Sequence, residues 1–104
     1  MSTMYFAVWA TDRAGALPDR ERLREAHRAR LRNPVGHDVK VLLGGPTLDE
    51  TAASMSGSLL VVQADSIEAV RRFIADDPYA LANVYAQVDV RPWNWGLGRP
   101  DSGT

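Results

Sequence analysis

His27 is the residue of this sequence best placed to do chemistry. Leu23 and Leu31 stand four residues to either side of it, so a helix would place the imidazole within an apolar stripe. A histidine in that position is commonly a core side chain that hydrogen-bonds a carbonyl or carboxylate group. The alternative is a general acid or base whose pKa is tuned by partial burial, and this role needs a carboxylate that orients the ring. Three carboxylates at the expected ends of elements are candidates for that partner: Asp12, Asp76 and Asp77.

The segment Asp77-Pro78-Tyr79 is a second place where chemistry is possible. Proline stiffens the backbone after the carboxylate and an aromatic ring follows, so Asp77 would be held in a defined direction. The plainer interpretation is a helix-terminating turn. Two arginines are candidates for holding an anionic substrate group, and Arg24, one helical turn before His27, is better placed than Arg13. Tyr79 and Asp12 are further candidate substrate contacts, although Asp12 suits a turn equally well.

The remaining motifs give weaker signals. Gly44-Gly45-Pro46 does not have the spacing of a phosphate-binding loop and predicts a tight exit from a strand. Trp93-Asn94-Trp95 suits stacking on a planar ligand, but packing in a core or an interface is at least as good an interpretation. His37 lies in a Gly/Asp segment, where we expect it to be solvated. The two histidines lack the HxxxH or HxH spacing of a metal site, and we expect neither a metal nor a cofactor.

Composition and charge exclude several classes of protein. The sequence has 104 residues, no cysteine and a formal net charge of −1. Without cysteine there is no disulfide framework, thiol nucleophile or thiolate metal site. The charge balance argues against nucleic acid as a partner, and no apolar run approaches the roughly 18–20 residues of a membrane span. No secretory leader is evident, so we expect a cytoplasmic protein that has no membrane partner.

The length suits a single domain over residues 1–98, followed by a flexible tail over residues 99–104. A chain of this size buries one core and leaves little room for a deep pocket within one copy.

The elements that must position these side chains follow from hydrophobic periodicity. Strands are expected over residues 4–10, 39–43, 58–64 and 84–91. A first helix is expected over residues 18–32, because Pro18 suits a first turn and Asn33-Pro34 ends it. A second helix begins at Asp65, the expected cap, and ends near residues 76–78. The order β-α-β-β-α-β predicts a ferredoxin-like α+β fold, with a four-stranded antiparallel sheet and both helices on one face.

The other face of that sheet needs a cover. Tyr5 and Trp9 would point away from the helices, together with apolar residues of the middle strands. The simplest cover for a short chain is a second copy of itself, so we expect a homodimer.

Taken together, the motifs of the chain resemble those of the YciI-like (YCII-related) family. The resemblance extends from about Tyr5 to Gly98 and follows one order of motifs. The matching segments are Asp12-Arg13-Ala14-Gly15, Arg24-x-x-His27, Val39-Lys40-x-x-x-Gly44-Gly45-Pro46, Met55-x-Gly57-Ser58-Leu59-Leu60, Asp77-Pro78-Tyr79-Ala80 and Val90-Arg91-Pro92-Trp93-Asn94-Trp95.

The resemblance implies a ferredoxin-like fold that dimerises into an α+β barrel, with a site built around His27 and Asp77. It also implies that some members act on chlorinated or hydroxylated aromatic compounds by proton transfer and elimination, without a cofactor, and that related domains occur joined to transcription-factor modules. The chain departs from the family pattern at two positions. Arg28 stands where a leucine usually follows the histidine, and Asn83 stands where a glycine is usual, in a left-handed turn that asparagine tolerates.

Three functions remain open at this point. The first is an enzyme in which Asp77 orients His27 for proton transfer on a small cyclic or aromatic substrate. The second is a non-catalytic module that binds a small molecule or has a regulatory role. The third, a cofactor-free monooxygenase, has no distinguishing residue in this sequence.

Overall fold

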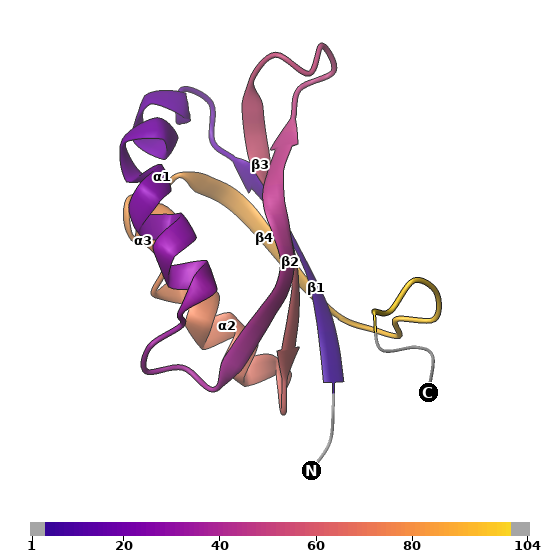
Figure 1. Ribbon diagram of the computed structural model, residues 1–104. Helices are drawn as coiled ribbons and strands as arrows, with labels where there is room; N and C mark the ends of the chain where they lie inside the picture. Colours follow the sequence, from indigo (N-terminus) through magenta and orange to yellow (C-terminus); the bar gives the residue numbers. More distant parts are fainter. Residues whose placement is uncertain (1–3, 101–104) are drawn as a thin grey trace.

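A computed structural model describes residues 4–100 of the chain (Figure 1). One antiparallel sheet of four strands, in the order β2-β3-β1-β4, carries all helices on one face (Figure 1). This confirms the expected β-α-β-β-α-β arrangement, to which the structure adds a short third helix. The elements are β1 (Met4–Asp12), α1 (Leu17–Arg32), β2 (Val39–Leu48), β3 (Met55–Ala64), α2 (Ile67–Ala75), α3 (Pro78–Leu81) and β4 (Tyr85–Trp93).

The core lies between the sheet and α2. Phe6 and Val8 of β1 stand beside Val62 and Leu60 of β3, and these side chains pack together with Phe73 of α2. Because side chains alternate along a strand, the residues between them point to the opposite face of the sheet. The core therefore fixes which residues of β1 and β3 remain uncovered.

The segment Gly44-Gly45-Pro46 lies inside β2, so the expected strand exit at this point is wrong. Pro46 pairs with Ser58 of β3. Proline lacks an N–H group but is tolerated in a strand that has a neighbour on one side only. Both edge strands contain a proline, Pro46 in β2 and Pro92 in β4, and the described central strands contain none.

The helix ends lie within a few residues of expectation, and α1 begins at Leu17 rather than at Pro18. Ser66 caps α2 by accepting a hydrogen bond from the N–H of Ala69 at 3.2 Å, so the expected cap, Asp65, is wrong by one residue. Helix α1 ends at Arg32, directly before Asn33-Pro34, as expected. Asn83 has a φ of 57°, which places it in the left-handed region as the sequence predicts.

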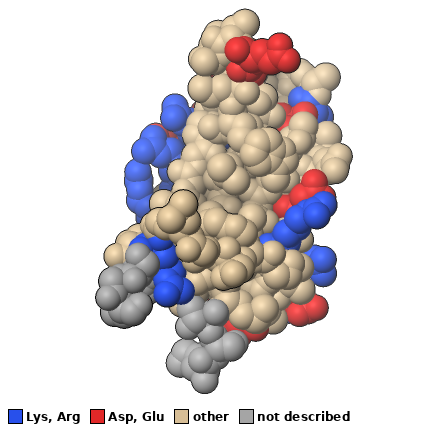
Figure 2. All heavy atoms as spheres, turned by 90° about the vertical axis from the view of Figure 1, so that its right-hand side faces the viewer, with Lys and Arg blue, Asp and Glu red and all other residues tan. Residues whose placement is uncertain are grey.

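The face of the sheet opposite the helices is open. Trp9, Leu43 and Leu59 are exposed there by 51%, 52% and 44%. Figure 2 views this side, where the uncharged surface is broad and the charged side chains lie mainly toward its margins.

None of the helices described is both long and apolar enough to cross a membrane. Of the tail expected to be flexible, residues 101–104 lie outside the described residues.

Candidate active site

His27 and Asp77 lie in direct contact, although fifty residues separate them in the chain. Nδ1 of His27 is 2.9 and 2.8 Å from the two carboxylate oxygens of Asp77, and both side chains are buried. A carboxylate accepts, so Nδ1 carries the hydrogen and donates it. The other ring nitrogen, Nε2, is thereby left unprotonated in the neutral imidazole.

Local folding explains why Asp77 points at the histidine. Asp77 is the N-cap of α3, and its carboxylate accepts a hydrogen bond from the N–H of Tyr79 at 2.9 Å. Pro78 begins that helix, where its missing N–H costs nothing. Arg30 adds a longer contact, with Nη1 3.4 Å from the carboxylate. One carboxylate therefore starts α3 and orients His27.

Tyr79 supports the histidine from the side. The rings of His27 and Tyr79 stack at 4.0 Å between centroids with 20° between their planes. The guanidinium of Arg20 lies 4.5 Å from the centroid of the same Tyr79 ring. Burial raises the pKa of Tyr79 above its ordinary value, so the phenol stays protonated near neutral pH. The imidazole thus packs against a fixed, neutral aromatic surface.

Arg20 is held by a buried polar network. It donates two hydrogen bonds to Asp12, at 2.7 and 2.9 Å, and a third to Oγ of Ser58 at 2.8 Å. Burial alone would lower the pKa of Arg20, but the hydrogen bonds and charge of Asp12 raise it above the ordinary value. Tyr85 donates to the same Oγ at 3.0 Å. This network ties α1 to β1, β3 and β4 beneath the site.

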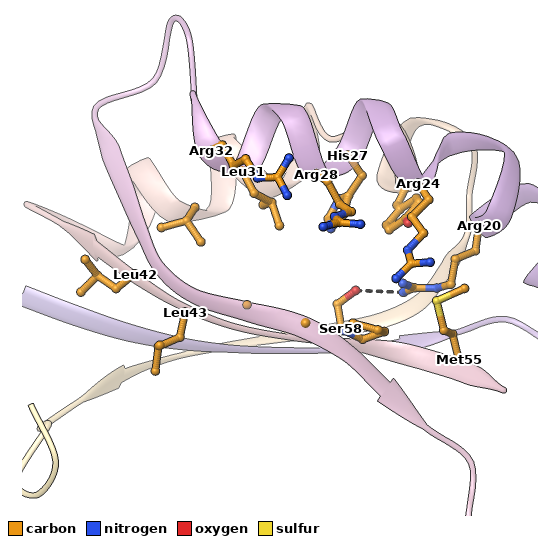
Figure 3. Close-up of a pocket in the computed structure, with 15 residues that line it drawn as sticks. Arg20, Arg24, His27, Arg28, Leu31, Arg32, Leu42, Leu43, Met55 and Ser58 are labelled. Carbon is orange, nitrogen blue, oxygen red and sulfur yellow. Dashed lines mark hydrogen bonds between the residues drawn. The ribbon is translucent and has the colours of Figure 1, made fainter. Parts of the chain in front are cut away.

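A cavity of about 350 Å³ opens beside His27, between α1 and β2 (Figure 3). Its α1 side carries Arg20, Arg24, Arg28 and Arg32 besides His27, and its β2 side includes Gly44-Gly45-Pro46. One chain thus forms a cavity by itself, although its length led us to expect little room for one. Since Nδ1 is engaged by Asp77, Nε2 is the ring nitrogen that remains for a molecule in this cavity.

Gly44 contributes to the space by having no side chain. A Cβ atom at this position would lie 2.8 Å from Cδ2 of Leu60 and 3.7 Å from Cδ1 of Leu31. Glycine here lets α1 lie over β2 while the cavity stays open between them.

The candidate site residues from the sequence divide into two groups. Arg24 and Tyr79 line the cavity with His27, and Asp77 stands behind the histidine. Asp12 and Arg13 do not line it: Asp12 binds Arg20, and Arg13 binds Asp19 and the carbonyl oxygen of Asn83. The third candidate partner for His27, Asp76, lies 3.1 Å from Nε2 of His37. The His37 side chain is 15% exposed, so its expected solvation is wrong.

Several cavity residues gave no clear signal in the sequence. Arg28, Arg32, Ser58 and the glycines of β2 all line the cavity. The only visible sign of the arginines is their four-residue spacing from Arg20 onward. The described residues do not bring three or more His, Asp or Glu side chains together as a metal-binding group would.

Comparison with known proteins places this geometry in a family. The model of the YCII-related domain matches residues 4–94. Protein YciI of Escherichia coli O6:H1 (strain CFT073) is 35% identical over 96 residues, covering 86% of this chain and 96% of the relative. An uncharacterised protein of Haemophilus influenzae is 33% identical over 94 residues, with the same coverage.

Solved structures agree with the fold. The 5-chloro-2-hydroxyhydroquinone dehydrochlorinase TftG of Burkholderia phenoliruptrix AC1100, in complex with 2,5-dihydroxybenzoquinone, superposes with a TM-score of 0.75 at 32% identity. The match covers 88% of this chain and 94% of TftG. Hydroxynitrile lyase from Passiflora edulis, with a TM-score of 0.52 at 13% identity, shares the fold only. The family match over residues 4–94 and the identity to YciI show that this chain belongs to the YCII-related family.

Proposed function

We propose that this protein is a small-molecule enzyme in which His27 and Asp77 transfer a proton, without a cofactor, in an elimination or isomerisation of a small cyclic or aromatic substrate. The observation that carries the proposal is the His27 ring, held at Nδ1 by a buried carboxylate and bordering a cavity of about 350 Å³. A histidine that served packing alone would need no adjoining cavity.

The chemistry follows from the two ring nitrogens. Asp77 fixes the tautomer with the hydrogen on Nδ1, so Nε2 has the free electron pair of a base. In an elimination, Nε2 takes a proton from the substrate, the bonding electrons form the new double bond, and the leaving group departs with its own electron pair. The imidazolium is stabilised by Asp77 and then returns its proton to the leaving group or to solvent. A general acid or base of this kind contributes about 10²–10⁴ in rate.

The lining and charge of the cavity support an anionic substrate with an apolar ring. Apolar and backbone surface from β2 forms one wall, and Arg24 lies one helical turn before His27. The relative TftG, a dehydrochlorinase, has a hydroxyhydroquinone as the substrate in its name and was solved with a dihydroxybenzoquinone. Dehydrochlorination removes a proton and a chloride ion, which is chemistry that one positioned histidine supports.

Turnover of a panel of chlorinated and hydroxylated hydroquinones tests the proposal. Absorbance follows quinone formation, and a chloride electrode follows the leaving group. We expect a His27→Ala variant to lose about 10²-fold or more in kcat, and a His37→Ala variant to keep its activity because His37 lies outside the cavity lining. A wild-type protein that binds these compounds but converts none of them would indicate the non-catalytic binding module instead.

We also propose that two copies associate through the open face of the sheet. Large apolar side chains gather on that face, with Trp9 and Leu59 adjacent through the β1–β3 pairing. Single exposed apolar residues are common, but a continuous patch marks an interface, and a flat sheet face is complementary to its own copy.

Sedimentation velocity at micromolar concentration tests this association. We expect the wild-type protein to be a dimer and a Trp9→Glu variant to be a monomer. Val35 is also exposed, but it lies in the segment that connects α1 to β2 and not on the sheet. Val35→Glu is therefore the matched control and should remain a dimer. A monomeric wild-type protein contradicts the proposal.

A further inference from the structure

Four arginines of α1 follow one another at four-residue spacing and line the cavity beside His27. We call Arg20, Arg24, Arg28 and Arg32 the arginine row. Residues four apart share a helix face, with a rise of about 6 Å per step. Figure 3 shows the row along α1, above the cavity and facing β2. The row therefore places a line of positive charge along one wall.

The arginines of α1 differ in whether a carboxylate neutralises them. Arg20, a member of the row, binds Asp12. Outside the row, Arg22 binds Asp19 and Arg30 binds Asp77. Three members of the row remain. Over residues 4–100, no carboxylate lies within 4.0 Å of their guanidinium groups, and the cavity lining contains neither Asp nor Glu. These remaining members are Arg24, Arg28 and Arg32. The unneutralised charge of this helix thus lies at the cavity.

Like charges four residues apart on a helix repel one another, so the row is unfavourable until an anion binds. A guanidinium group matches a carboxylate with two parallel hydrogen bonds. Arg24 and Arg32 are eight residues apart, about 12 Å along the helix axis. A single carboxylate cannot reach both ends of that line.

We infer that the ligand of this cavity is a small organic dianion, with a ring between two acidic groups. Arg24, next to His27, holds the first acidic group, and Arg28 with Arg32 holds the second. The ring lies on the wall formed by Gly44 and the neighbouring backbone of β2, within reach of His27. The inference rests on the proposed function, because it assigns the substrate class of the same site.

Calorimetric titration at fixed ionic strength tests the inference with four probes: terephthalate, benzoate, dimethyl terephthalate and inorganic phosphate. Terephthalate has two carboxylates across a ring, benzoate has one and the ester has none. We expect terephthalate to bind about tenfold more tightly than benzoate or phosphate, and the ester not to bind.

Arginine-to-glutamine variants then assign the two groups. Arg28→Gln and Arg32→Gln should each weaken terephthalate binding about fivefold and leave benzoate binding unchanged, whereas Arg24→Gln should weaken both. Arg22 lies on the same helix outside the cavity lining, so Arg22→Gln is the matched control for a change of one charge and should alter neither affinity. All four positions are exposed, so we expect each variant to fold.

Three results overturn the inference: no binding of terephthalate up to about 10 mM, equal affinity for terephthalate and benzoate, or an Arg22→Gln effect as large as that of Arg28→Gln. The same titrations on a His27→Ala variant separate the two proposals. Dianion binding that depends on Arg28 and Arg32, in a protein that shows no turnover, supports the inference and refutes the enzyme. Turnover that requires His27, in a protein with no preference for dianions, supports the enzyme and refutes the inference.

Discussion

Replacing Asp77 by asparagine tests how the site works, because the two side chains have the same shape. The carboxylate of Asp77 accepts hydrogen bonds from Nδ1 of His27 at 2.8 Å and from the N–H of Tyr79 at 2.9 Å. An asparagine oxygen can keep the second bond, and asparagine caps a helix about as well as aspartate. The amide NH₂ group must then face Nδ1. This favours the tautomer with the hydrogen on Nε2, which cannot act as a base.

The expected loss in kcat for Asp77→Asn is therefore about 10²–10⁴, the full contribution of a general base. The free energy of unfolding should change less than the activation free energy does. The charged contacts to His27 and Arg30 are lost, at about 1–3 kcal/mol together, while the cap of α3 is retained. Arg30 makes this cost larger rather than smaller, since within the described chain its buried Nη2 atom already has no hydrogen-bond partner.

Three measurements check the prediction: kcat on the substrate identified by the panel, the free energy of unfolding in urea, and the ¹⁵N shifts of the His27 ring. Asp76→Asn is the matched control, because Asp76 is the adjacent carboxylate and contacts His37 instead. A folded Asp77→Asn protein whose kcat stays within about threefold of wild type refutes the assignment of Asp77 as the residue that positions His27.

Three other predictions concern the frame that carries the site. A Cβ atom at Gly57 would collide with the carbonyl oxygen of Ala10, so Gly57→Ala should lower the free energy of unfolding by more than about 2 kcal/mol, measured in urea. Asn83 has a positive φ, so Asn83→Val should lower the melting temperature and Asn83→Gly should not, by calorimetry; equal effects would contradict the left-handed assignment. Burial, opposed in part by the hydrogen bond to Ser58, raises the pKa of Tyr85 above its ordinary value of about 10. Above about pH 10 the unfolded chain loses the Tyr85 proton while the folded protein keeps it, so the free energy of unfolding should be constant below about pH 9 and fall as the pH rises past 10. The fall with pH should be weaker in Tyr85→Phe, and an equal fall in both proteins would contradict the assignment.

Periodicity in the sequence was enough to predict the order of the four strands and the two longer helices, but not α3 or the second half of β2. The alternation in β1 and the helical spacing of Val70 and Phe73 determine which faces are buried, and the structure has the same core. The pairing of His27 with Asp77 needed the family resemblance, because the residues alone left Asp12 and Asp76 as alternatives. Contacts between residues fifty positions apart depend on how helices pack, and this is not visible in local spacing.

The cavity was the part that the sequence did not reveal. Gly44-Gly45-Pro46 has the residue types that end strands, and only the strand order shows that β2 is an edge where proline is tolerated. No local pattern indicated that Arg28 and Arg32 line a cavity. Whether an exposed arginine faces bulk water or a cavity is decided by the neighbouring strand, which comes later in the chain.

Because β2 lies at the edge of the sheet, selection can act on the cavity wall separately from the contact between His27 and Asp77. His27 comes from α1 and Asp77 caps α3, and the hydrogen bonds of Arg20 tie α1 to the central strands β1 and β3. The facing wall comes from β2, which pairs with β3 alone. Changes along β2 can reshape the wall without moving the histidine or its carboxylate. A lineage built on this frame can therefore change the shape of the cavity by altering one outer strand while His27 and Asp77 keep their contact.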